Sequence, residues 1–354
     1  MNATPLVAIQ CMTYNHAPYI EDAMNGFCMQ QTDFPFVAII VDDASTDGEP
    51  DVIKRYLDQH FDMLNARQWE TDEAHFIEAQ HLENKSCWFA VVFLKYNFWQ
   101  TKKQKDPLFE DWNNPAKYIA LCEGDDYWTD SAKLQRQVDF LENNENIGLA
   151  YTIAQVYNEK SKTVIGTWGK ETNLNCVLFE QSPIPTLSVL MRSGLYHRFR
   201  GILRGDPKWP LGDVPLWIHF IVFSKIHFLP ITTGVYRLLE ESASHSCDFY
   251  KRTNFISRAF LCRQYYANKF VNEQTTKKVA LIRIQNLLHQ SFLYNKRLNL
   301  PLIKNMIESR ILNPKIFVLI ILSKFRLGRK VVNTQRNLRV KNRKKVTNYF
   351  PVGS

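Results

Sequence analysis

The stretch Tyr118-Ile119-Ala120-Leu121-Cys122-Glu123-Gly124-Asp125-Asp126 decides how this chain is interpreted. Its first five residues form a continuous apolar run, which is typical of a buried strand. Three carboxylates then crowd together at the end of that strand, where they repel one another unless a cation lies between them. A hard divalent cation bridging to phosphate oxygens is one explanation. A solvated acidic turn before a helix that starts near Ser131 is the other, and the stretch alone favours neither.

Two further buried strands are predicted nearer the start of the chain. They are Leu6–Cys11 and Phe36–Val41, and amphipathic helices over about residues 17–30 and 50–60 follow them. Continuous apolar strands that alternate with helices indicate βαβ units and a parallel sheet covered on both faces. Ligands of such sheets bind at the carboxyl ends of the strands. Polar turns follow all three strands, so we predict that residues 13–15, 42–47 and 123–126 converge on one sheet edge.

The rest of the chain gives coarser predictions. Residues 65–114 are polar and aromatic, and we expect helical pieces and a long loop there, as a variable insertion. We predict helices over about 131–143 and 213–223, strands at 149–154, 186–191 and 234–238, and helical structure from about residue 249 almost to the end.

Composition limits the class of protein. The 354 residues suffice for one large domain and a smaller one, and the seven cysteines include no close C-x-x-C pair, which argues against a zinc site or a disulfide framework. The N-terminus has neither a basic segment nor a long apolar segment, so we expect no signal peptide and a cytoplasmic location.

The charge is unevenly distributed. The net charge is +9, yet twelve basic and no acidic residues lie between Ser309 and Ser354. Seven apolar residues, Ile316–Leu322, precede the denser basic part, far fewer than the roughly 20 needed to span a bilayer. An apolar patch followed by basic residues favours a helix on an anionic membrane surface. A helix packed on the protein, with a disordered basic end, is the alternative. We expect no nucleic-acid binding, because no recognised module accompanies the charge.

These motifs together resemble the family 2 inverting glycosyltransferases of the GT-A fold, most closely the bacterial members that build capsule, lipopolysaccharide and other surface glycans. The resemblance runs from about Pro5 to Ser246. Its landmarks are residues 13–16, 30–35, 42–48, 118–133, 212–213, 235–237 and 242–245. It implies an α/β fold with a Rossmann-like, mostly parallel sheet, helices on both faces and a C-terminal helical basic extension.

The resemblance also implies domains. Residues 1–248 would form the catalytic domain, with a nucleotide-sugar-binding half at 1–128 and an acceptor-binding half at 129–248. Residues 249–354 would form a helical region with a basic, membrane-associated tail. The enzyme would then lie at the inner face of the bacterial cytoplasmic membrane and act on a glycan or lipid-linked acceptor.

Roles for the nucleotide-binding residues follow from the same resemblance. Asp43 would accept a hydrogen bond from the base, typically uracil, and other bases would leave it unpaired. Asp42 would support the loop, and we interpret Asp47 as the N-cap of the next helix. The remaining nucleotide-sugar contacts implied are Thr13, Tyr14, Asn15, Ser45, Asp125 and Arg237, and Arg237 has the alternative of bracing a loop.

The metal site is implied as well. Asp126 would coordinate Mn²⁺ or Mg²⁺, Asp125 would assist or contact ribose, and Glu123 would be a neighbour rather than a ligand. His245 is a further candidate ligand. Because the motif often holds His where this chain has Leu239, His245 as a phosphate or loop contact is equally open.

The proton acceptor implied is Asp213, which follows Gly212 and opens an aromatic helix. A carboxylate base of this kind contributes about 10²–10⁴-fold to rate. Many members carry two adjacent acids here, so Asp213 as a simple helix N-cap stays an alternative. Trp128 and Trp209 are candidates for stacking on sugar rings, although a tryptophan is more often part of a core.

Two other functions remain open. A sugar nucleotidyltransferase shares strand-end carboxylates, but it would want a Gly-rich loop with Lys or Arg after the first strand, where this chain has residues 11–16 without one. A catalytically inactive glycan-binding or nucleotide-sugar-binding protein is the other, and the intact candidate acids argue against it.

Overall fold

The computed structural model describes residues 4–101, 103–180, 182–203, 213–240, 248–298, 304, 314–326, 328–329 and 332. The chain forms two compact units. The first contains Met1–Asn173, Ser182–Gly205 and His219–Leu238, and the second contains Leu174–Gln181, Asp206–Ile218 and Leu239–Ser354.

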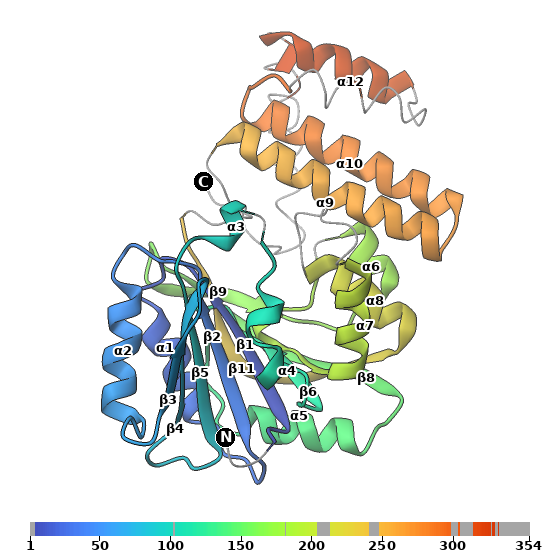
Figure 1. The fold of residues 1–354 in the computed structure, drawn as a ribbon. Coiled ribbons are helices and arrows are strands. Elements are labelled where there is room, and N and C mark those ends of the chain that lie inside the picture. Colours follow the sequence, from blue (N-terminus) through green and yellow to red (C-terminus); the bar gives the residue numbers. More distant parts are fainter. Residues whose placement is uncertain are drawn as a thin grey trace. The chain divides into compact units, whose positions relative to one another are not determined.

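The first unit is built on one mixed sheet, which Figure 1 shows with α1 and α2 beside it. The strand order is β3-β4-β5-β2-β1-β6-β10-β8-β11-β7, and β9 pairs with β8. The central neighbours β5, β2, β1 and β6 are parallel. The strands are β1 (Val7–Thr13), β2 (Phe36–Asp42), β3 (Arg67–Glu70), β4 (Ala74–Gln80), β5 (Cys87–Leu94), β6 (Tyr118–Leu121), β7 (Tyr127–Trp128), β8 (Ile147–Asn158), β9 (Thr163–Trp168), β10 (Leu190–Arg192) and β11 (Lys225–Leu238).

The helices of this unit lie between these strands along the chain. They are α1 (Ile20–Cys28), α2 (Glu49–His60), α3 (Phe98–Thr101), α4 (Glu110–Asn113), α5 (Lys133–Glu142) and α7 (Ser193–Leu203), with short 3₁₀ turns at Asp106–Leu108 and Thr186–Ser188. The predicted apolar stripe of α1 is confirmed, since Ile20, Ala23, Met24 and Phe27 are all fully buried.

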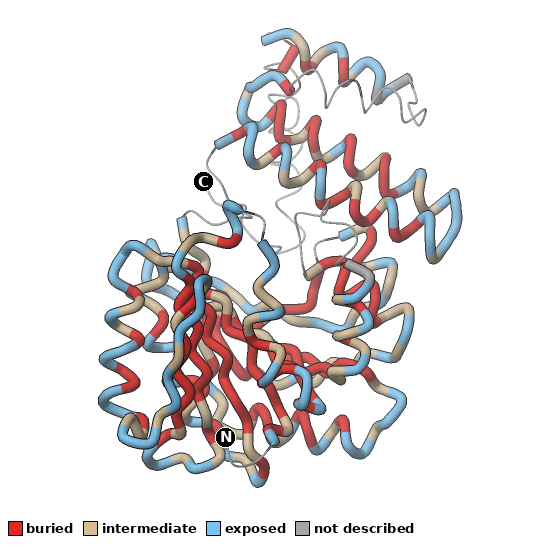
Figure 2. The backbone as a smooth tube through the Cα atoms, viewed as in Figure 1, coloured by how far each residue is buried: buried red, intermediate tan, exposed pale blue. Residues whose placement is uncertain are grey.

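The core follows the strands. All seven residues of β2 are buried, as are all but one of β1, and Figure 2 shows this buried band crossing the sheet between more exposed helices. Strands buried on both faces explain the continuous apolar runs in the sequence. The predicted α/β fold with a large, mostly parallel central sheet is therefore confirmed.

The prediction for residues 65–114 was wrong over residues 67–94, although the helical pieces it expected are present further on. Three strands, β3, β4 and β5, occupy much of the segment, and the helical pieces are confined to residues 98–113. The Cys87–Leu94 run is the missed signal, because all of its residues except Trp88 are buried, and the strand pairs with β2 in parallel register. The Thr186–Met191 strand prediction was wrong in its first half, which is a 3₁₀ turn before the short β10.

The second unit consists of helices in its described part. They are α6 (Leu174–Phe179), α9 (Phe249–Phe270), α10 (Glu273–Leu293) and α12 (Pro314–Lys324), while α8 (Asp213–Phe223) is divided between the units. Asp248 and Asn272 cap α9 and α10 by accepting backbone N–H bonds. Phe249, Ile284, Leu288 and Ile320 lie in one buried cluster. None of the helices in the described residues is long and apolar enough to cross a membrane.

Candidate active site

Three polar segments meet at the carboxyl edge of the sheet, as predicted. Thr13 at the end of β1 is opposite Asp42 at the end of β2. The backbone N–H of Asp43 donates to the carbonyl of Thr13 at 3.0 Å, and that of Gly124 donates to Met12 at 3.1 Å. The structure thus brings the loop after β1, the loop after β2 and the acidic loop after β6 side by side.

Glu49, the first residue of α2, connects these loops. Its carboxylate is completely buried and accepts hydrogen bonds from the Thr13 hydroxyl, from the His16 backbone N–H at 2.9 Å and from the Ser45 hydroxyl at 2.8 Å. Sequence reasoning missed this residue. The signal in the sequence was an acidic residue directly after Gly48. Gly48, with a φ of 93°, is the N-cap of α2, and Asp47 is not.

Asp47 was therefore wrongly interpreted as the N-cap, although its side chain still serves the loop. One oxygen accepts the Glu49 backbone N–H at 3.1 Å, and the other accepts the Ala17 backbone N–H at 2.9 Å. A residue one position before the cap can thus bond the first turn and also bridge to the loop after β1.

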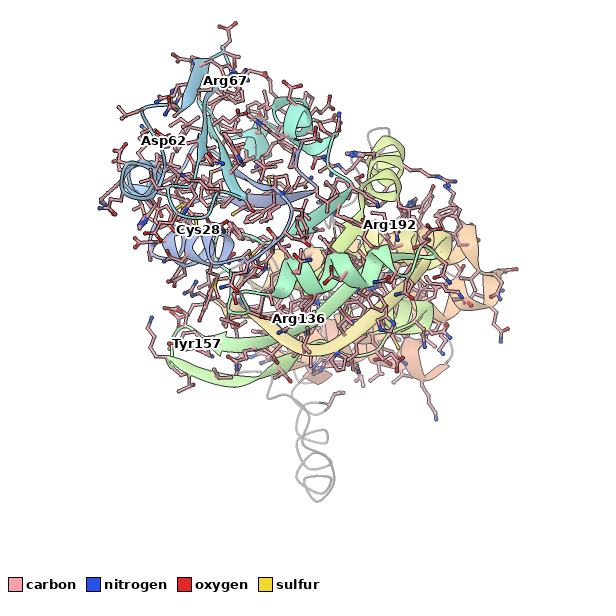
Figure 3. The ribbon with its side chains drawn as sticks, turned by 90° about the horizontal axis from the view of Figure 1, so that it is seen from below. Cys28, Asp62, Arg67, Arg136, Tyr157 and Arg192 are labelled. Carbon is pink, nitrogen blue, oxygen red and sulfur yellow. The ribbon has the colours of Figure 1, made fainter. Side chains whose placement is uncertain are left out.

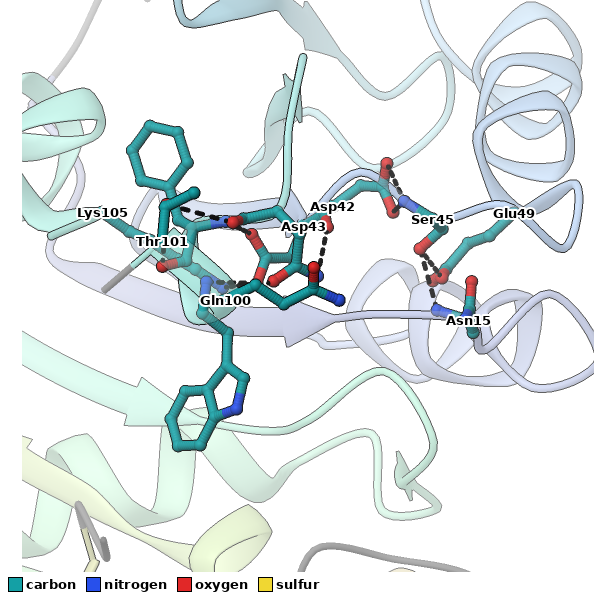
Figure 4. A network of polar contacts seen from close by, with 11 residues as sticks. Asn15, Asp42, Asp43, Ser45, Glu49, Gln100, Thr101 and Lys105 are labelled. Carbon is teal, nitrogen blue, oxygen red and sulfur yellow. Dashed lines mark hydrogen bonds and ion pairs between the residues drawn. The ribbon is translucent and has the colours of Figure 1, made fainter. Parts of the chain in front are cut away.

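Asn15 and Ser45 join the loops after β1 and β2, as Figure 4 shows. The Asn15 backbone N–H donates to the Ser45 hydroxyl at 2.8 Å, and the Asn15 side chain accepts the Thr46 backbone N–H at 2.9 Å. Asp42 is buried and accepts the Ser45 backbone N–H. Burial raises the pKa of Asp42 to about 6, against the lowering effect of its hydrogen bonds from Ser45. Tyr14 is 39% exposed, so this edge is open to solvent at Tyr14.

Asp43 is buried under α3. Its carboxylate accepts the backbone N–H of Phe98 at 2.7 Å and of Trp99 at 3.3 Å, and it pairs with the Lys105 ammonium at 2.8 Å. Figure 4 shows Lys105 and Asp43 in the same network. A carboxylate offers about four lone-pair sites, so these donors leave it one further acceptor position. Lys105 was not predicted, because its distance from Asp43 along the sequence hides the contact.

The two aspartates of the acidic loop, Asp125 and Asp126, differ in how far they are buried. Asp126 is 2% exposed, and its Oδ1 accepts the Arg237 backbone N–H at 2.8 Å. Burial, followed by repulsion from Asp125 and Glu123, raises the pKa of Asp126 well above its usual range. Asp125 is more exposed, with its Oδ2 4.0 Å from His16 Nε2. Within the described residues, no group of three or more His, Cys, Asp and Glu side chains is placed to hold a metal ion.

Arg237 braces this loop. Its guanidinium pairs with Asp22, donates to the Asp125 carbonyl at 3.0 Å and lies 3.6 Å from Glu159. It also lies over the ring of Tyr127, 4.5 Å from the centroid. These contacts favour the bracing alternative over phosphate binding, because they leave the buried guanidinium few free donors.

Trp128 lies in the core. It is 2% exposed, its indole N–H donates to the Leu187 carbonyl at 2.7 Å, and the Lys133 ammonium lies 4.1 Å from its ring centroid. Phe27 packs edge-on against the same ring. These contacts favour the core interpretation of Trp128 over sugar stacking. Trp209, Gly212 and His245 lie outside the described residues.

Asp213 opens α8, as the sequence predicted. Its Oδ1 accepts the Val214 backbone N–H at 2.7 Å. Burial raises the pKa of Asp213 above its usual value, while the charge of Arg263 opposes that rise. A carboxylate with a raised pKa is a better proton acceptor than an ordinary one, and that property suits a general base. Asp213 is also the first residue of α8, where a carboxylate stabilises the start of a helix, so the alternative structural role fits the same position.

Comparison with known proteins agrees with this geometry. Residues 11–68 match the family model for glycosyl transferase family 2. The crystal structure of residues 1–349 of Staphylococcus aureus TarS in complex with UDP-GlcNAc is similar, with a TM-score of 0.51 and 14% identity over 98% of this chain and 94% of that one. That likeness shows the fold alone, which is GT-A-like, as the sequence resemblance implied. Residues 11–68 are thus the part of the chain that matches family 2 glycosyltransferases in sequence.

Two relatives are similar in sequence. An uncharacterised protein of Mycobacterium tuberculosis is 28% identical over 251 residues, covering 68% of this chain. The chain spans 61% of that relative's length. TuaG of Bacillus subtilis, provisionally named a teichuronic acid biosynthesis glycosyltransferase, is 26% identical over 140 residues, which are 40% of this chain and 43% of TuaG.

Proposed function

We propose that this protein transfers a sugar, with inversion, from a nucleoside diphosphate donor to a glycan or lipid-linked acceptor in cell-surface polysaccharide biosynthesis. The observation that supports this most is the meeting of Thr13, Asp42 and Asp43 with the acidic loop at one sheet edge. Ligands of open α/β sheets bind at such an edge. The provisional name of TuaG supports the biosynthetic setting.

The donor we propose is a UDP-sugar. Asp43 has acceptor capacity left beside its bonds to α3 and Lys105, so it can accept an N–H from the edge of uracil. Thr13, Tyr14, Asn15 and Ser45 form the two adjoining loops, and Asp125 is the aspartate exposed enough to meet ribose or phosphate. The similar fold of TarS, which was crystallised with UDP-GlcNAc, supports this choice.

The acidic loop fits a divalent cation in its chemistry. Asp126 is a buried carboxylate that Asp125 and Glu123 repel, and the backbone N–H and the charge of Arg237 offset that repulsion in part. Asp126 and Asp125 would hold Mn²⁺ or Mg²⁺, and oxygen atoms of the donor diphosphate would complete the ligand set. The cation, when bound, supplies positive charge to the departing nucleoside diphosphate. His245 remains a proposed further ligand.

Asp213 is the proposed general base. The acceptor hydroxyl must lose a proton as it attacks the anomeric carbon on the face opposite the departing diphosphate, and inversion follows from that geometry. Asp213 would take this proton at a carboxylate oxygen. Its raised pKa makes proton transfer from the hydroxyl less unfavourable than it would be to an ordinary aspartate.

Hydrolysis and transfer assays with a panel of nucleotide sugars test this function. We expect turnover of a UDP-sugar with Mn²⁺ and loss of turnover with a chelator or in Asp126→Ala. Asp213→Asn should retain donor binding and lose transfer. A protein that turns over no nucleotide sugar, or one that is indifferent to both chelator and Asp126→Ala, would contradict the proposal.

Membrane association at the cytoplasmic face is the proposed setting. In the second unit, α12 places Ile320 in the helical core while Phe317, Val318 and Ile321 are 41–53% exposed, and the following Phe325 is 60% exposed. Phe317, Val318 and Ile321, at the first position and one and four positions after it, share one face of α12, and Phe325 follows the end of the helix. Lys315, Lys324 and Arg326 flank them, which is the composition of a helix on an anionic surface.

A further inference from the structure

His16, in the loop after β1, has a side chain that the function proposed above does not use. Its imidazole Nε2 lies 4.0 Å from the Oδ2 atom of Asp125 in the acidic loop, and the two side chains are 21% and 20% exposed. A separation of 4.0 Å is too long for a hydrogen bond between these two atoms. Both groups are thus accessible to a ligand that binds at this edge of the sheet.

A chain of hydrogen bonds determines which nitrogen of His16 carries the ring proton. The buried Glu49 carboxylate, which Figure 4 shows beside Ser45, accepts the single hydroxyl proton of Thr13. The Thr13 hydroxyl oxygen lies 3.2 Å from His16 Nδ1, so it must accept a hydrogen bond from that nitrogen. In the neutral imidazole the proton is therefore on Nδ1, and Nε2, the atom near Asp125, is a hydrogen-bond acceptor.

The fold holds the His16 ring in this orientation. Thr13 ends β1 and Glu49 begins α2, so both partners of the chain of hydrogen bonds belong to regular elements. Glu49 also accepts the His16 backbone N–H at 2.9 Å. An acceptor that is already fixed in place loses little conformational entropy when a ligand binds to it.

The strand order places the ribose of a nucleotide near His16. Strand β1 lies between β2 and β6, so Asp43, the proposed acceptor for the base, is on one side of the loop after β1, and Asp125 is on the other. Ribose is the group that joins the base to the diphosphate. A nucleotide that reaches from Asp43 to the acidic loop therefore carries its ribose across the loop that contains His16.

We propose, building on the function proposed above, that His16 Nε2 and Asp125 Oδ2 together recognise the two neighbouring hydroxyl groups of the donor ribose. Each hydroxyl donates one proton, and each of the two atoms accepts one. Acceptors 4.0 Å apart suit hydroxyls on adjacent carbons, each at a hydrogen-bond distance of about 2.8 Å. A nucleotide without these hydroxyls leaves both acceptors unpaired, so the pair selects ribonucleotides.

Calorimetric titration of the full chain with UDP and with 2′,3′-dideoxy-UDP, both in saturating Mn²⁺, tests this pair. The wild type should bind UDP at least tenfold more tightly, because two hydrogen bonds are lost with the hydroxyls, one of them to a charged group. His16→Leu has no acceptor, so it should reduce this ratio about 3–10-fold and leave the affinity for the dideoxy nucleotide unchanged. His16→Gln, whose amide oxygen can accept, should restore part of the ratio.

His60, the last residue of α2, provides a matched control. It is exposed, and α2 is 12 residues long, which places His60 roughly 16 Å along the helix from Glu49. Figure 3 labels Asp62, two residues further on, in the view from below. His60→Leu should leave both affinities and their ratio unchanged.

A pair of variants at Thr13 tests the chain of hydrogen bonds. Thr13→Ser keeps a hydroxyl between Glu49 and His16, so it should keep the wild-type ratio. Thr13→Val has a similar shape but no hydroxyl, so the His16 ring loses its partner at Nδ1 and the ratio should fall about as far as in His16→Leu. A wild-type ratio in Thr13→Val would contradict the role of this chain.

The outcomes separate this proposal from the proposed function. Equal binding of UDP and the dideoxy nucleotide by the wild type, or a ratio that survives His16→Leu, would overturn the ribose assignment and leave the proposed function intact. An equal loss of affinity for both nucleotides in His16→Leu would mean that His16 acts on the cation, the diphosphate or the fold, and would also overturn it. A wild type that binds neither nucleotide would contradict the proposed function itself, and the ribose assignment with it.

Discussion

At the residue scale, the candidate site combines residues that sequence patterns can identify with residues that they cannot. Asp42, Asp43, Asp125 and Asp126 follow predicted strands, so the topology alone placed them at one edge. Glu49 and Lys105 come from a helix start and a distant loop, and only the folded backbone brings them to Thr13 and Asp43. Burial of a charged side chain depends on tertiary contacts, which a single sequence does not display.

Asp43 and Lys105 make a matched pair of variants. Asp43→Asn should weaken UDP binding about 10–100-fold, because a hydrogen bond to a charged group contributes about 1.5–3 kcal/mol. Lys105→Ala removes the ion pair but leaves the carboxylate for the base, so UDP affinity should be retained. Titration calorimetry measures both. Equal losses in the two variants would mean that Asp43 acts only by anchoring α3.

Asp42 should impose a pH dependence on stability. Its folded pKa of about 6 exceeds the unfolded value of about 3.9, so the native state binds more protons between these values and stability falls as pH rises from about 4 to about 6. The fall is on the order of 2–3 kcal/mol. Asp42→Asn keeps an acceptor for the Ser45 backbone N–H but has no ionisable group, so this pH-dependent fall in stability should be absent from the variant. Urea unfolding at several pH values gives the difference, and parallel pH profiles would refute the assignment.

At the scale of elements, β1, α1, β2, α2 and β6, which lead into the candidate site, were predictable from apolar runs and helical periodicity. Strands β3 and β4 were not, because polar residues interrupt them, whereas the apolar Cys87–Leu94 run of β5 was a signal that sequence reasoning missed. The segment in which a long loop was expected instead supplies the three strands β3, β4 and β5 on one side of β2. Because β5 pairs with β2, the segment that follows β5 begins next to Asp43, and its Phe98 backbone N–H reaches the Asp43 carboxylate.

A substitution at Gly124 tests whether the acidic loop has to pack closely against Thr13 in the loop after β1. A Cβ atom at Gly124 would lie 2.2 Å from the Thr13 hydroxyl oxygen and 2.7 Å from its Cβ. Gly124→Ala should therefore destabilise the fold by about 1–3 kcal/mol and push the loops apart, with loss of donor binding in the folded protein. Gly194→Ala is the control, because nothing lies within 4 Å of that Cβ. Unchanged melting and binding in Gly124→Ala would contradict this contact.

At the scale of the whole molecule, the sequence separated a sheet-based unit from a basic helical region, and the structure also forms two compact units. The exact division could not be predicted, because residues 174–181 and 206–218 join the helical unit from within the first two-thirds of the chain. Contacts between segments far apart in sequence determine such membership. Most of residues 330–354, the densest basic part, lie outside the described residues.

The exposed face of α12 should bind anionic membranes. Replacing Phe317 and Ile321 with Glu removes two apolar side chains that are 49% and 41% exposed and adds repulsion from lipid headgroups. Flotation with anionic vesicles should show at least a tenfold loss of binding, with the helical content unchanged. Substituting the exposed Tyr265 of α9 with Glu is the control. Equal flotation of all three proteins would exclude α12 as the membrane contact.

The most direct test of the central claim is equilibrium binding of UDP to the full chain in the presence of Mn²⁺, with uridine as the comparison ligand. A nucleoside diphosphate site at the carboxyl edge of the sheet predicts that UDP binds at least tenfold more tightly than uridine and that this advantage disappears in Asp125→Asn combined with Asp126→Asn. UDP binding equal to that of uridine, or an advantage that survives both substitutions, would contradict the account.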